Sequence, residues 1–235
     1  MKSILLAGLL FAFPLASSAK FDLFSSFSTN KPATSATTSL DDQVSILADA
    51  TPIDPKVLKL ALTAYNCAAN AGQNKQEILT IVDYSRPSSE KRMWVLDLAQ
   101  NKVLFHSLVA HGQGSGEVMP TRFSNKAQTH ASSLGLFVTG EVYQGKHGQS
   151  LRLHGMEENF NENALSRAIV VHGAKYVNAS LAKSGRIGRS WGCPAVPQEL
   201  AQPIIDSIKG GSVVFAYYPH EAWLEKSKYL NCSVA

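Results

Sequence analysis

The residues of this chain that are best suited to chemistry are one cysteine and one histidine. Cys193 lies in the segment Gly-Arg-Ser-Trp-Gly-Cys-Pro-Ala-Val at residues 188–196, and His172 ends an apolar run upstream of it. A thiolate is a strong nucleophile, and a neutral imidazole beside a thiol can accept its proton. The pair therefore predicts covalent catalysis, in which Cys193 attacks a carbonyl carbon and His172 acts as the general base.

The neighbours of Cys193 fit the same chemistry. Gly192 lets a substrate approach the backbone closely, and Pro194 stiffens the turn. The N–H groups of Gly192 and Cys193 are candidates for an oxyanion hole, in which one donor contributes about 2.7–4 kcal/mol. Ser190 supplies a hydroxyl three residues before the cysteine, and it either adds a donor to the site or caps the turn.

Other interpretations use the same residues. A lone Gly-Cys pair also occurs as a small buried hydrophobe, and a histidine on an apolar strand is often a core residue. His154 also ends a strand-like run before a glycine, so it is the second candidate for the base or a substrate contact. Zinc held by Cys193, His172 and His154 is chemically feasible, but the paired spacing typical of zinc sites is absent. We therefore expect no metal and no organic cofactor.

A wider pattern connects the histidine to the cysteine. His172 is followed, after 17 intervening residues, by Ser190-Trp191-Gly192-Cys193. This pattern resembles the signature of the L,D-transpeptidase (YkuD-type) family, and it is closest to the murein L,D-transpeptidase branch, whose motif reads Gly-Arg-Ser-x-Gly-Cys-Pro-Ala-Val. Further blocks resemble the same branch, so the resemblance extends over about residues 78–218; they lie at 83–85, 92–98, 111–116 and 132–137.

The resemblance implies a fold and a reaction. The fold is mainly β, a β-sandwich or barrel-like catalytic domain with a few peripheral helices, an N-terminal helix and the cysteine loop at its rim. In the reaction, Cys193 attacks the L-centre carbonyl of a peptidoglycan stem tetrapeptide, expels the terminal D-amino acid and passes the acyl group to an amine. Gly173 matches the position whose backbone carbonyl orients the catalytic histidine in this family.

Three points stay open on the sequence. The amine acceptor is a stem peptide, a D-amino acid or a wall protein. Water in place of the amine would make the protein an L,D-carboxypeptidase or an amidase. A non-catalytic envelope protein that binds peptidoglycan is the alternative outside the enzymes, although a binding protein has no need of a thiol beside a base.

Two positions depart from the broader family motif. Trp191 stands where many members carry His, and Ala195 stands where many carry Arg or Asn. Because that Arg would help to hold the substrate, another arginine is expected to recognise a carboxylate here through paired guanidinium hydrogen bonds, the alternative being that the arginines are solvated surface charges. The expected substrate-binding residues are therefore His154, Arg189, Trp191 and Arg152, with Arg186 as an alternative.

The N-terminal region predicts export. Residues 1–19 combine a lysine, a short apolar run and a small-residue cleavage site, which is the pattern of a signal peptide. Residues 20–42 are rich in Ser, Thr and Ala and are expected to form a flexible linker. We expect an N-terminal helical segment over 43–76 and the catalytic domain over 77–235. The protein is then periplasmic or otherwise exported, with no stable membrane insertion after signal removal.

Periodicity and turn residues predict the elements. Asp54 and Pro55 suit the start of a helix that Gly72 ends. The glycine-rich segment 111–116 lacks the lysine of a phosphate loop and is expected to form a flexible wall of the cleft. Short β runs lie at 78–82, 92–97, 102–109, 134–139, 151–154, 168–172 and 212–218, with further helices at 161–167 and 198–208.

Composition and the remaining cysteines add limits. The chain has 235 residues, a formal net charge of +4 and a pI near 8.9. This charge favours an anionic envelope polymer as much as ordinary solubility, and it is too diffuse to predict a nucleic-acid partner. Cys67 and Cys232 either form a disulfide that leaves Cys193 free or are small buried residues. The oligomeric state is not determined by the sequence.

Overall fold

The computed structural model describes residues 39–232. The expected signal peptide at 1–19 and the expected linker up to residue 38 lie outside the described residues. The described part contains one eight-stranded mixed sheet in the order β3-β2-β1-β8-β4-β5-β6-β7. Its strands are β1 (Ile78–Asp83), β2 (Met93–Asp97), β3 (Lys102–Ser107), β4 (Gly135–Gly145), β5 (Gly148–Gly155), β6 (Val170–Ala174), β7 (Ala195–Pro197) and β8 (Val213–Tyr217).

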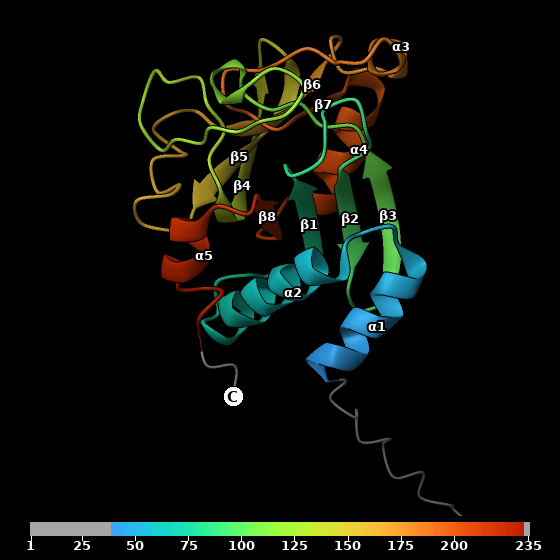
Figure 1. Cartoon of the computed structure of the whole chain (residues 1–235), viewed down its shortest axis with the longest axis vertical. Coiled ribbons are helices and arrows are strands. Elements are labelled where there is room, and N and C mark those ends of the chain that lie inside the picture. The colour runs from blue at the N-terminus through green and yellow to red at the C-terminus, as the bar shows by residue number, and fades with distance from the viewer. Residues whose placement is uncertain (1–38, 233–235) are drawn as a thin grey trace, which may run out of the picture. The chain divides into compact units, whose positions relative to one another are not determined.

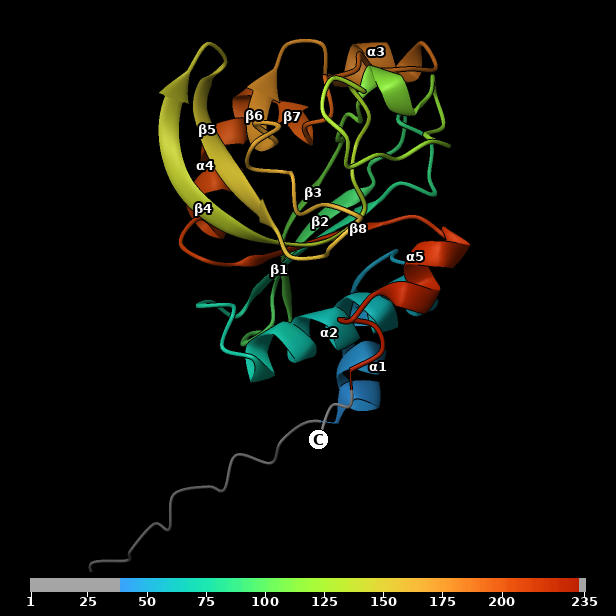
Figure 2. The same cartoon turned by 90° about the vertical axis from the view of Figure 1, so that its left-hand side faces the viewer.

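The sheet curls into a nearly closed barrel. β8 pairs parallel with β1 and antiparallel with β4, so the C-terminal strand joins the two halves of the sheet. β4 and β5 form a long curved hairpin (Figure 2). At the far ends of the sheet, the N–H of Ala110 donates to the carbonyl of Ala195 at 2.8 Å, which brings the chain after β3 against β7. The expected mainly β, barrel-like fold is thus confirmed.

Helices cover the barrel at its sides and at one end. They are α1 (Leu40–Ala50), α2 (Pro55–Asn70), α3 (Ala179–Lys183), α4 (Gln198–Ile208) and α5 (Glu221–Lys226), with a 3₁₀ turn η1 (Gln113–Ser115). α1 and α2 pack together beside the strands β1, β3 and β8, and α4 packs against β5 and β6 (Figure 1). None of the helices within residues 39–232 is long and apolar enough to cross a membrane.

Two helices form as the sequence predicts. The carboxylate of Asp54 accepts the N–H groups of Lys56 and Val57 at 2.8 and 3.4 Å, which caps α2, and Pro55 occupies its first turn. α4 covers the predicted range 198–208 and buries an apolar stripe that contains Ile204, Ile205 and Ile208. Because α4 lies directly on β6, it fixes the strand that carries His172.

Other elements differ from expectation. The expected segment 43–76 contains two helices, and α1 begins at Leu40 because the Ser39 hydroxyl accepts the N–H of Asp42 at 3.2 Å. The final residues of the expected linker are therefore helical. The expected helix at 161–167 is instead a series of turns, since the Asn161 side chain accepts the N–H of Glu157 and donates to the carbonyls of residues 134 and 136.

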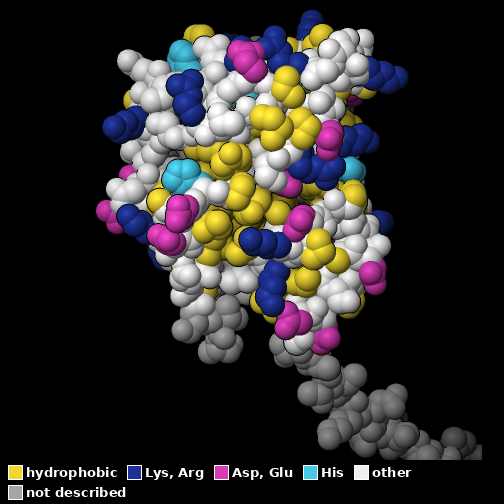
Figure 3. Space-filling model, in the orientation of Figure 1, with side chains coloured by type: hydrophobic (Ala, Val, Ile, Leu, Met, Phe, Trp, Pro, Cys, Tyr) yellow, Lys and Arg dark blue, Asp and Glu magenta, His cyan; other side chains and the backbone are white. Residues whose placement is uncertain are grey.

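Charges are mixed on the surface. On the face drawn in Figure 3, Lys and Arg side chains are interspersed with Asp and Glu around a central apolar area. No single basic surface covers this face. This distribution agrees with the diffuse positive charge of the sequence.

A disulfide joins Cys67 in α2 to Cys232 near the C-terminus, with Cα atoms 6.2 Å apart, and it leaves Cys193 as the free cysteine. We expect the double substitution Cys67→Ser, Cys232→Ser to lower the free energy of unfolding by about 2–5 kcal/mol, because the bridge restricts a long loop of the unfolded chain. Denaturant unfolding of the oxidised wild-type protein and of the double variant measures this difference. Three reactive thiols in the unfolded, unreduced wild-type protein would contradict the bridge.

Candidate active site

The cysteine loop, residues 188–194, is held from behind by the glycine-rich segment. The N–H of Ser190 donates to the carbonyl of His111 at 2.9 Å, and the N–H of Gln113 donates to the carbonyl of Ser190 at 2.8 Å. His111 is fully buried, and its Nδ1 accepts from the guanidinium of Arg92 at 2.8 Å. No residue of 111–116 lines the pocket described below, so the prediction that this segment is a wall of the cleft is wrong. The segment is a partly buried support behind the loop.

Ser190 closes the cysteine loop on itself. Its hydroxyl donates to the carbonyl of Cys193 at 2.6 Å and accepts the N–H of Gly192 at 3.1 Å. The turn-capping alternative for Ser190 matches this geometry. The Gly192 N–H, one of the two expected oxyanion donors, is thereby engaged. The Cys193 N–H has no acceptor among the described residues, so it remains a free backbone donor of the loop.

Gly192 occupies a position that a side chain does not fit. Its φ is +118°, and a Cβ atom there would lie 2.8 Å from the carbonyl oxygen of Ala131. The carbonyl of Gly192 accepts the hydroxyl of Ser132 at 3.2 Å, so the loop is held close against residues 131–132.

We expect Gly192→Ala to displace the cysteine loop, with a loss of stability of about 1–3 kcal/mol from the unfavourable φ alone. Iodoacetamide alkylation of Cys193 should slow at least severalfold, and thermal unfolding should move to lower temperature. Gly185→Ala is the matched control, because Gly185 also has a positive φ, +98°, but nothing lies within 4 Å of its Cβ position. Equal alkylation rates in the two variants would contradict a special role of Gly192.

His172 is fixed in one tautomer. It is buried in β6, and its Nδ1 lies 2.9 Å from the carbonyl oxygen of Gly173. Because a carbonyl only accepts, Nδ1 carries the proton and Nε2 is the basic nitrogen. Position 173 must be small for this arrangement, since a Cβ there would lie 2.9 Å from the Ala201 side chain of α4. The expected contact between Gly173 and the histidine ring is thus present.

The surroundings of His172 keep its ring neutral. Burial lowers the pKa of His172 below its ordinary value, and the nearby His147 and Lys146 lower it further against the opposing effect of the Gly173 carbonyl. His147 stacks on the His172 ring with centroids 4.5 Å apart. A neutral imidazole with a free Nε2 is the form that can accept a proton.

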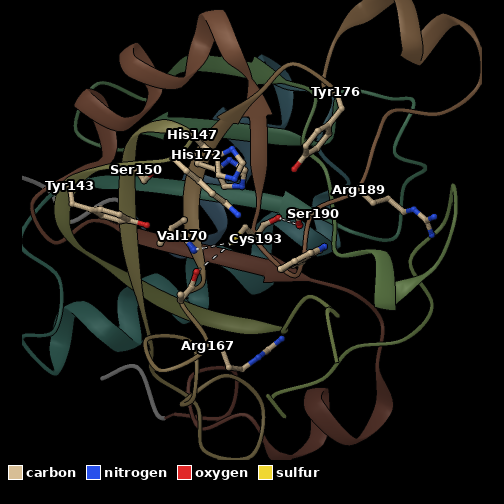
Figure 4. A pocket seen from close by; sticks show the side chains of 13 residues that line it. Tyr143, His147, Ser150, Arg167, Val170, His172, Tyr176, Arg189, Ser190 and Cys193 are labelled. Carbon is tan, nitrogen blue, oxygen red and sulfur yellow. Dashed lines mark hydrogen bonds between the residues drawn. The ribbon is translucent and has the colours of Figure 1, made fainter. Parts of the chain in front are cut away.

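The thiol of Cys193 is held by the chain just before β6. Sγ accepts the N–H of Val170 at 3.5 Å and donates to the carbonyl of Ala168 at 3.6 Å (Figure 4). Burial raises the pKa of the Cys193 thiol, against the lowering effects of the Val170 N–H and the cations of Arg167 and Lys146. The resting site therefore pairs a neutral thiol with a neutral imidazole, and no hydrogen bond between them is present within residues 39–232.

A pocket of about 360 Å³ brings the thiol and the imidazole together. It contains three cationic side chains, those of Lys146, Arg167 and Arg189, and no carboxylate lines it. Figure 4 shows Cys193 at its centre, with His172 and His147 on one side and Ser190 on the other. The remaining lining residues are Tyr143, Ser150, Ala168, Val170, Tyr176 and Trp191.

Two of the four expected substrate-binding residues lie at this pocket. Trp191 is 65% exposed at its rim, stacks on His130 with ring centroids 4.7 Å apart and lies under the ammonium of Lys146. Arg189 also lines the pocket, but its guanidinium is paired with Glu117 at 2.7 Å. The alternative candidate Arg186 binds the same Glu117 carboxylate and does not line the pocket.

His154 and Arg152 do not line the pocket. Both alternate with the buried Leu151 and Leu153, so they lie on the same face of β5 as Ser150, which does line the pocket. Arg152 stacks over the Tyr143 ring at 4.6 Å, and His154 faces Glu141 at 4.0 Å. The lining residue of β5 is Ser150, and four strand residues beyond it correspond to about 13 Å. His154 thus lies along β5 beyond the pocket, and Arg152 lies beside the pocket against the lining residue Tyr143. Their roles as a base or as substrate contacts stay predictions.

The position of His154 also decides whether it can form a zinc site with Cys193 and His172. Among residues 39–232, no group of three or more His, Cys, Asp or Glu side chains could hold a metal ion. His154 lies too far along β5 to join the other two expected ligands. The described residues therefore do not form the zinc site weighed on the sequence.

Sequence reasoning missed several residues of the pocket. Lys146 and His147 form the tip of the β4–β5 hairpin between Gly145 and Gly148, a two-residue connection that flanking glycines signal. Arg167 lies near the end of the series of turns that replaces the helix expected at 161–167. Tyr143 and Tyr176 carry no local signal of a pocket, because their role depends on how the barrel curls.

The chain resembles solved L,D-transpeptidase structures. The Ldtfm–avibactam carbamoyl enzyme is 13% identical, with a TM-score of 0.40 over 62% of this chain and 51% of that chain. An L,D-transpeptidase from Mycobacterium smegmatis is 14% identical, with a TM-score of 0.39 over 61% and 59%. One from Stackebrandtia nassauensis is 13% identical, with a TM-score of 0.36 over 77% and 92%. The chain thus spans little more than half the length of the first two structures.

No curated protein matches the chain. A protein family does match the chain. The sequence pattern of the L,D-transpeptidase catalytic domain matches residues 49–217, a range that contains both His172 and Cys193. The chain therefore belongs to the L,D-transpeptidase catalytic domain family, whose members act on peptidoglycan.

Proposed function

We propose that this protein is a cysteine-dependent peptidoglycan L,D-transpeptidase of the murein branch. Cys193 forms an acyl-enzyme with a stem tetrapeptide and transfers the acyl group to an amine acceptor. One observation carries the proposal: in a domain of this family, the neutral thiol of Cys193 and the imidazole of His172, held in one tautomer, line the same pocket. A binding protein would gain nothing from this pair.

Acylation begins with a change of partner for the thiol proton. The thiol turns from the Ala168 carbonyl to Nε2 of His172, which takes the proton as Sγ attacks the L-centre carbonyl carbon of the stem peptide. The negative charge on the carbonyl oxygen is met by the free N–H of Cys193. The C–N bond then breaks, and the imidazolium returns its proton to the departing amine of the D-amino acid. A thioester and a free D-amino acid result.

In deacylation the acceptor amine is the attacking group and the Cys193 sulfur is the leaving group. An amine acceptor gives a proton to His172 as its nitrogen attacks the thioester carbonyl, and the C–S bond breaks. Cys193 recovers the proton, so the site returns to its neutral pair with no net change of charge. Water in place of the amine would give a free tripeptide and make the enzyme an L,D-carboxypeptidase.

The charges of the pocket support a substrate with free carboxylates. Three cationic and no acidic side chains line it, and Trp191 offers an exposed aromatic surface at its rim. Stem peptides carry carboxylates at their termini, so a cationic pocket matches them. The N-terminal export pattern and this substrate together support a place in the periplasm or another exported part of the envelope.

The test uses purified disaccharide tetrapeptide as both donor and acceptor. The proposal expects a covalent adduct on Cys193 by intact mass spectrometry and a cross-linked dimer with loss of one terminal D-amino acid by liquid chromatography. A free tripeptide without dimer would identify hydrolysis instead. Absence of both an adduct and any product, with the thiol shown to be reduced, would overturn the enzymatic proposal, and binding to isolated sacculi would then support the non-catalytic alternative.

A further inference from the structure

Arg167 holds a positive charge that no carboxylate neutralises. Its Nη1 donates to the carbonyl of Ser124 and to the hydroxyl of Ser133, and its Nη2 donates to the carbonyl of Ala131, each at 2.6 Å. All three acceptors are uncharged, and within residues 39–232 no ion pair involves Arg167. The guanidinium is therefore fixed in place while its charge stays available to an anion.

This charge lies against the cysteine loop. Nη2 of Arg167 is 3.3 Å from the position that a Cβ atom on Gly192 would take. The carbonyl of Ala168 and the N–H of Val170, which contact Sγ, follow Arg167 along the same short segment. Both Arg167 and Cys193 line the pocket (Figure 4). One segment thus brings a fixed cation and the two thiol contacts to the nucleophile.

A positive charge near the cysteine loop would stabilise the anion that forms when Cys193 reacts. Proton transfer to His172 leaves a thiolate, and the Ala168 carbonyl that accepts the resting S–H would repel that anion. The Gly192 N–H is already donated to Ser190, so the backbone supplies few donors for negative charge. A low-dielectric pocket makes a fixed cation more effective here than it would be in water.

We infer that Arg167 is a charge-stabilising residue of the site, which favours the Cys193 thiolate and then the acyl oxyanion through its fixed guanidinium. No bond to Arg167 forms or breaks: the thiol proton goes to His172, and the negative charge moves from sulfur to the carbonyl oxygen as the C–S bond forms. The inference rests on the proposed function only in taking Cys193 as the nucleophile. Burial lowers the pKa of Arg167 and raises the pKa of Cys193, and each of the two groups opposes this effect on the other.

The other two cations of the pocket fit this task less well. Arg189 already pairs with Glu117, which cancels much of its charge. Lys146 is exposed at the tip of a hairpin, where its ammonium lies 5.5 Å from the centroid of the Trp191 ring. Arg167 is the pocket cation whose guanidinium is held by three short hydrogen bonds and has no acidic partner among the described residues.

The test measures alkylation of Cys193 by iodoacetamide against pH in the full-length, oxidised protein. An opposite charge near an ionisable group shifts its pKa by about 1–3 units. Arg167→Gln should therefore raise the midpoint of alkylation by about one pH unit or more, with a rate roughly tenfold lower at pH 7. Arg167→Lys should have an alkylation midpoint close to that of the wild-type protein, because lysine keeps the positive charge. It loses only the hydrogen bonds to the three acceptors.

Arg122→Gln is the control, since it removes the same charge from an exposed position away from the pocket and should leave the midpoint unchanged. If thermal unfolding shows that Arg167→Gln does not fold, Arg167→Met is used in its place, because methionine keeps the apolar part of the side chain and also removes the charge. A wild-type midpoint in the neutral variant overturns the inference, and so does a Lys variant whose midpoint moves as far as that of the neutral one. Alkylation requires no peptidoglycan, so a missing cross-link product would contradict the proposed function alone.

Discussion

Cys193→Ala is expected to abolish acyl-enzyme formation and to lower turnover by roughly 10⁴-fold or more, because loss of a nucleophile leaves only binding and oxyanion contacts. The fold should persist. The thiol is partly exposed and makes only two long contacts, at 3.5 and 3.6 Å, to the backbone. Intact mass spectrometry after incubation with a carbapenem checks the adduct, and muropeptide analysis checks the turnover.

Cys193→Ser is the matched control for shape. It keeps a small polar side chain with a proton donor, but an alkoxide forms far less readily than a thiolate, so it should be nearly as inactive as the alanine variant. Both variants should unfold within a few degrees of the wild-type protein. Turnover by Cys193→Ala comparable with that of the wild type would place the chemistry at another residue.

His172→Gln is expected to lower the rate of acylation by about 10²–10⁴-fold, the usual contribution of a general base. Glutamine fills a similar volume in β6 and can still donate toward the Gly173 carbonyl, but it cannot accept the thiol proton. The carbapenem adduct should therefore form slowly on Cys193, and its rate is the quantity to measure.

His147→Gln provides the comparison for this variant. His147 stacks on His172 and lines the same pocket, but it comes from the exposed tip of the β4–β5 hairpin. Its loss should raise the pKa of His172, because His147 contributes to lowering it, with a smaller effect on the acylation rate. Loss of activity in His147→Gln as large as in His172→Gln would contradict the assignment of the base.

The pH dependence of acylation should follow the two shifted groups. His172 must be neutral to accept the proton, and its pKa is lowered by burial, so the rate should rise with pH through a midpoint below about 6.5 and then stay level near neutral pH. The pKa of Cys193 is raised, so the thiol remains protonated across that plateau. A midpoint well above 7 in the wild-type rate would contradict a neutral resting pair.

Much of this site could be predicted because its chemistry is local in the sequence. The Ser-Trp-Gly-Cys motif and the apolar run before His172 indicate a candidate nucleophile and a candidate base without any coordinates. The same holds for α2, where Asp54 and Pro55 define a helix start, and for α4, whose apolar spacing marks a buried stripe. These features depend on residue type and short-range periodicity, which the sequence displays directly.

The sequence alone thus indicated the family, a candidate nucleophile, a candidate base and most strands of the sheet. Only the tertiary structure decided which distant residues share the pocket. His154 lies on a strand as predicted and shares a face of β5 with Ser150, but it lies farther along the strand than the pocket extends, while the hairpin tip brings Lys146 and His147 to the pocket. Arg167 is held beside the cysteine loop by hydrogen bonds to three acceptors that are remote from it in the sequence. The pairing of Cys67 with Cys232 likewise follows from the approach of α2 to the C-terminal tail. Such contacts follow from sheet closure and register, which residue spacing along the chain does not encode.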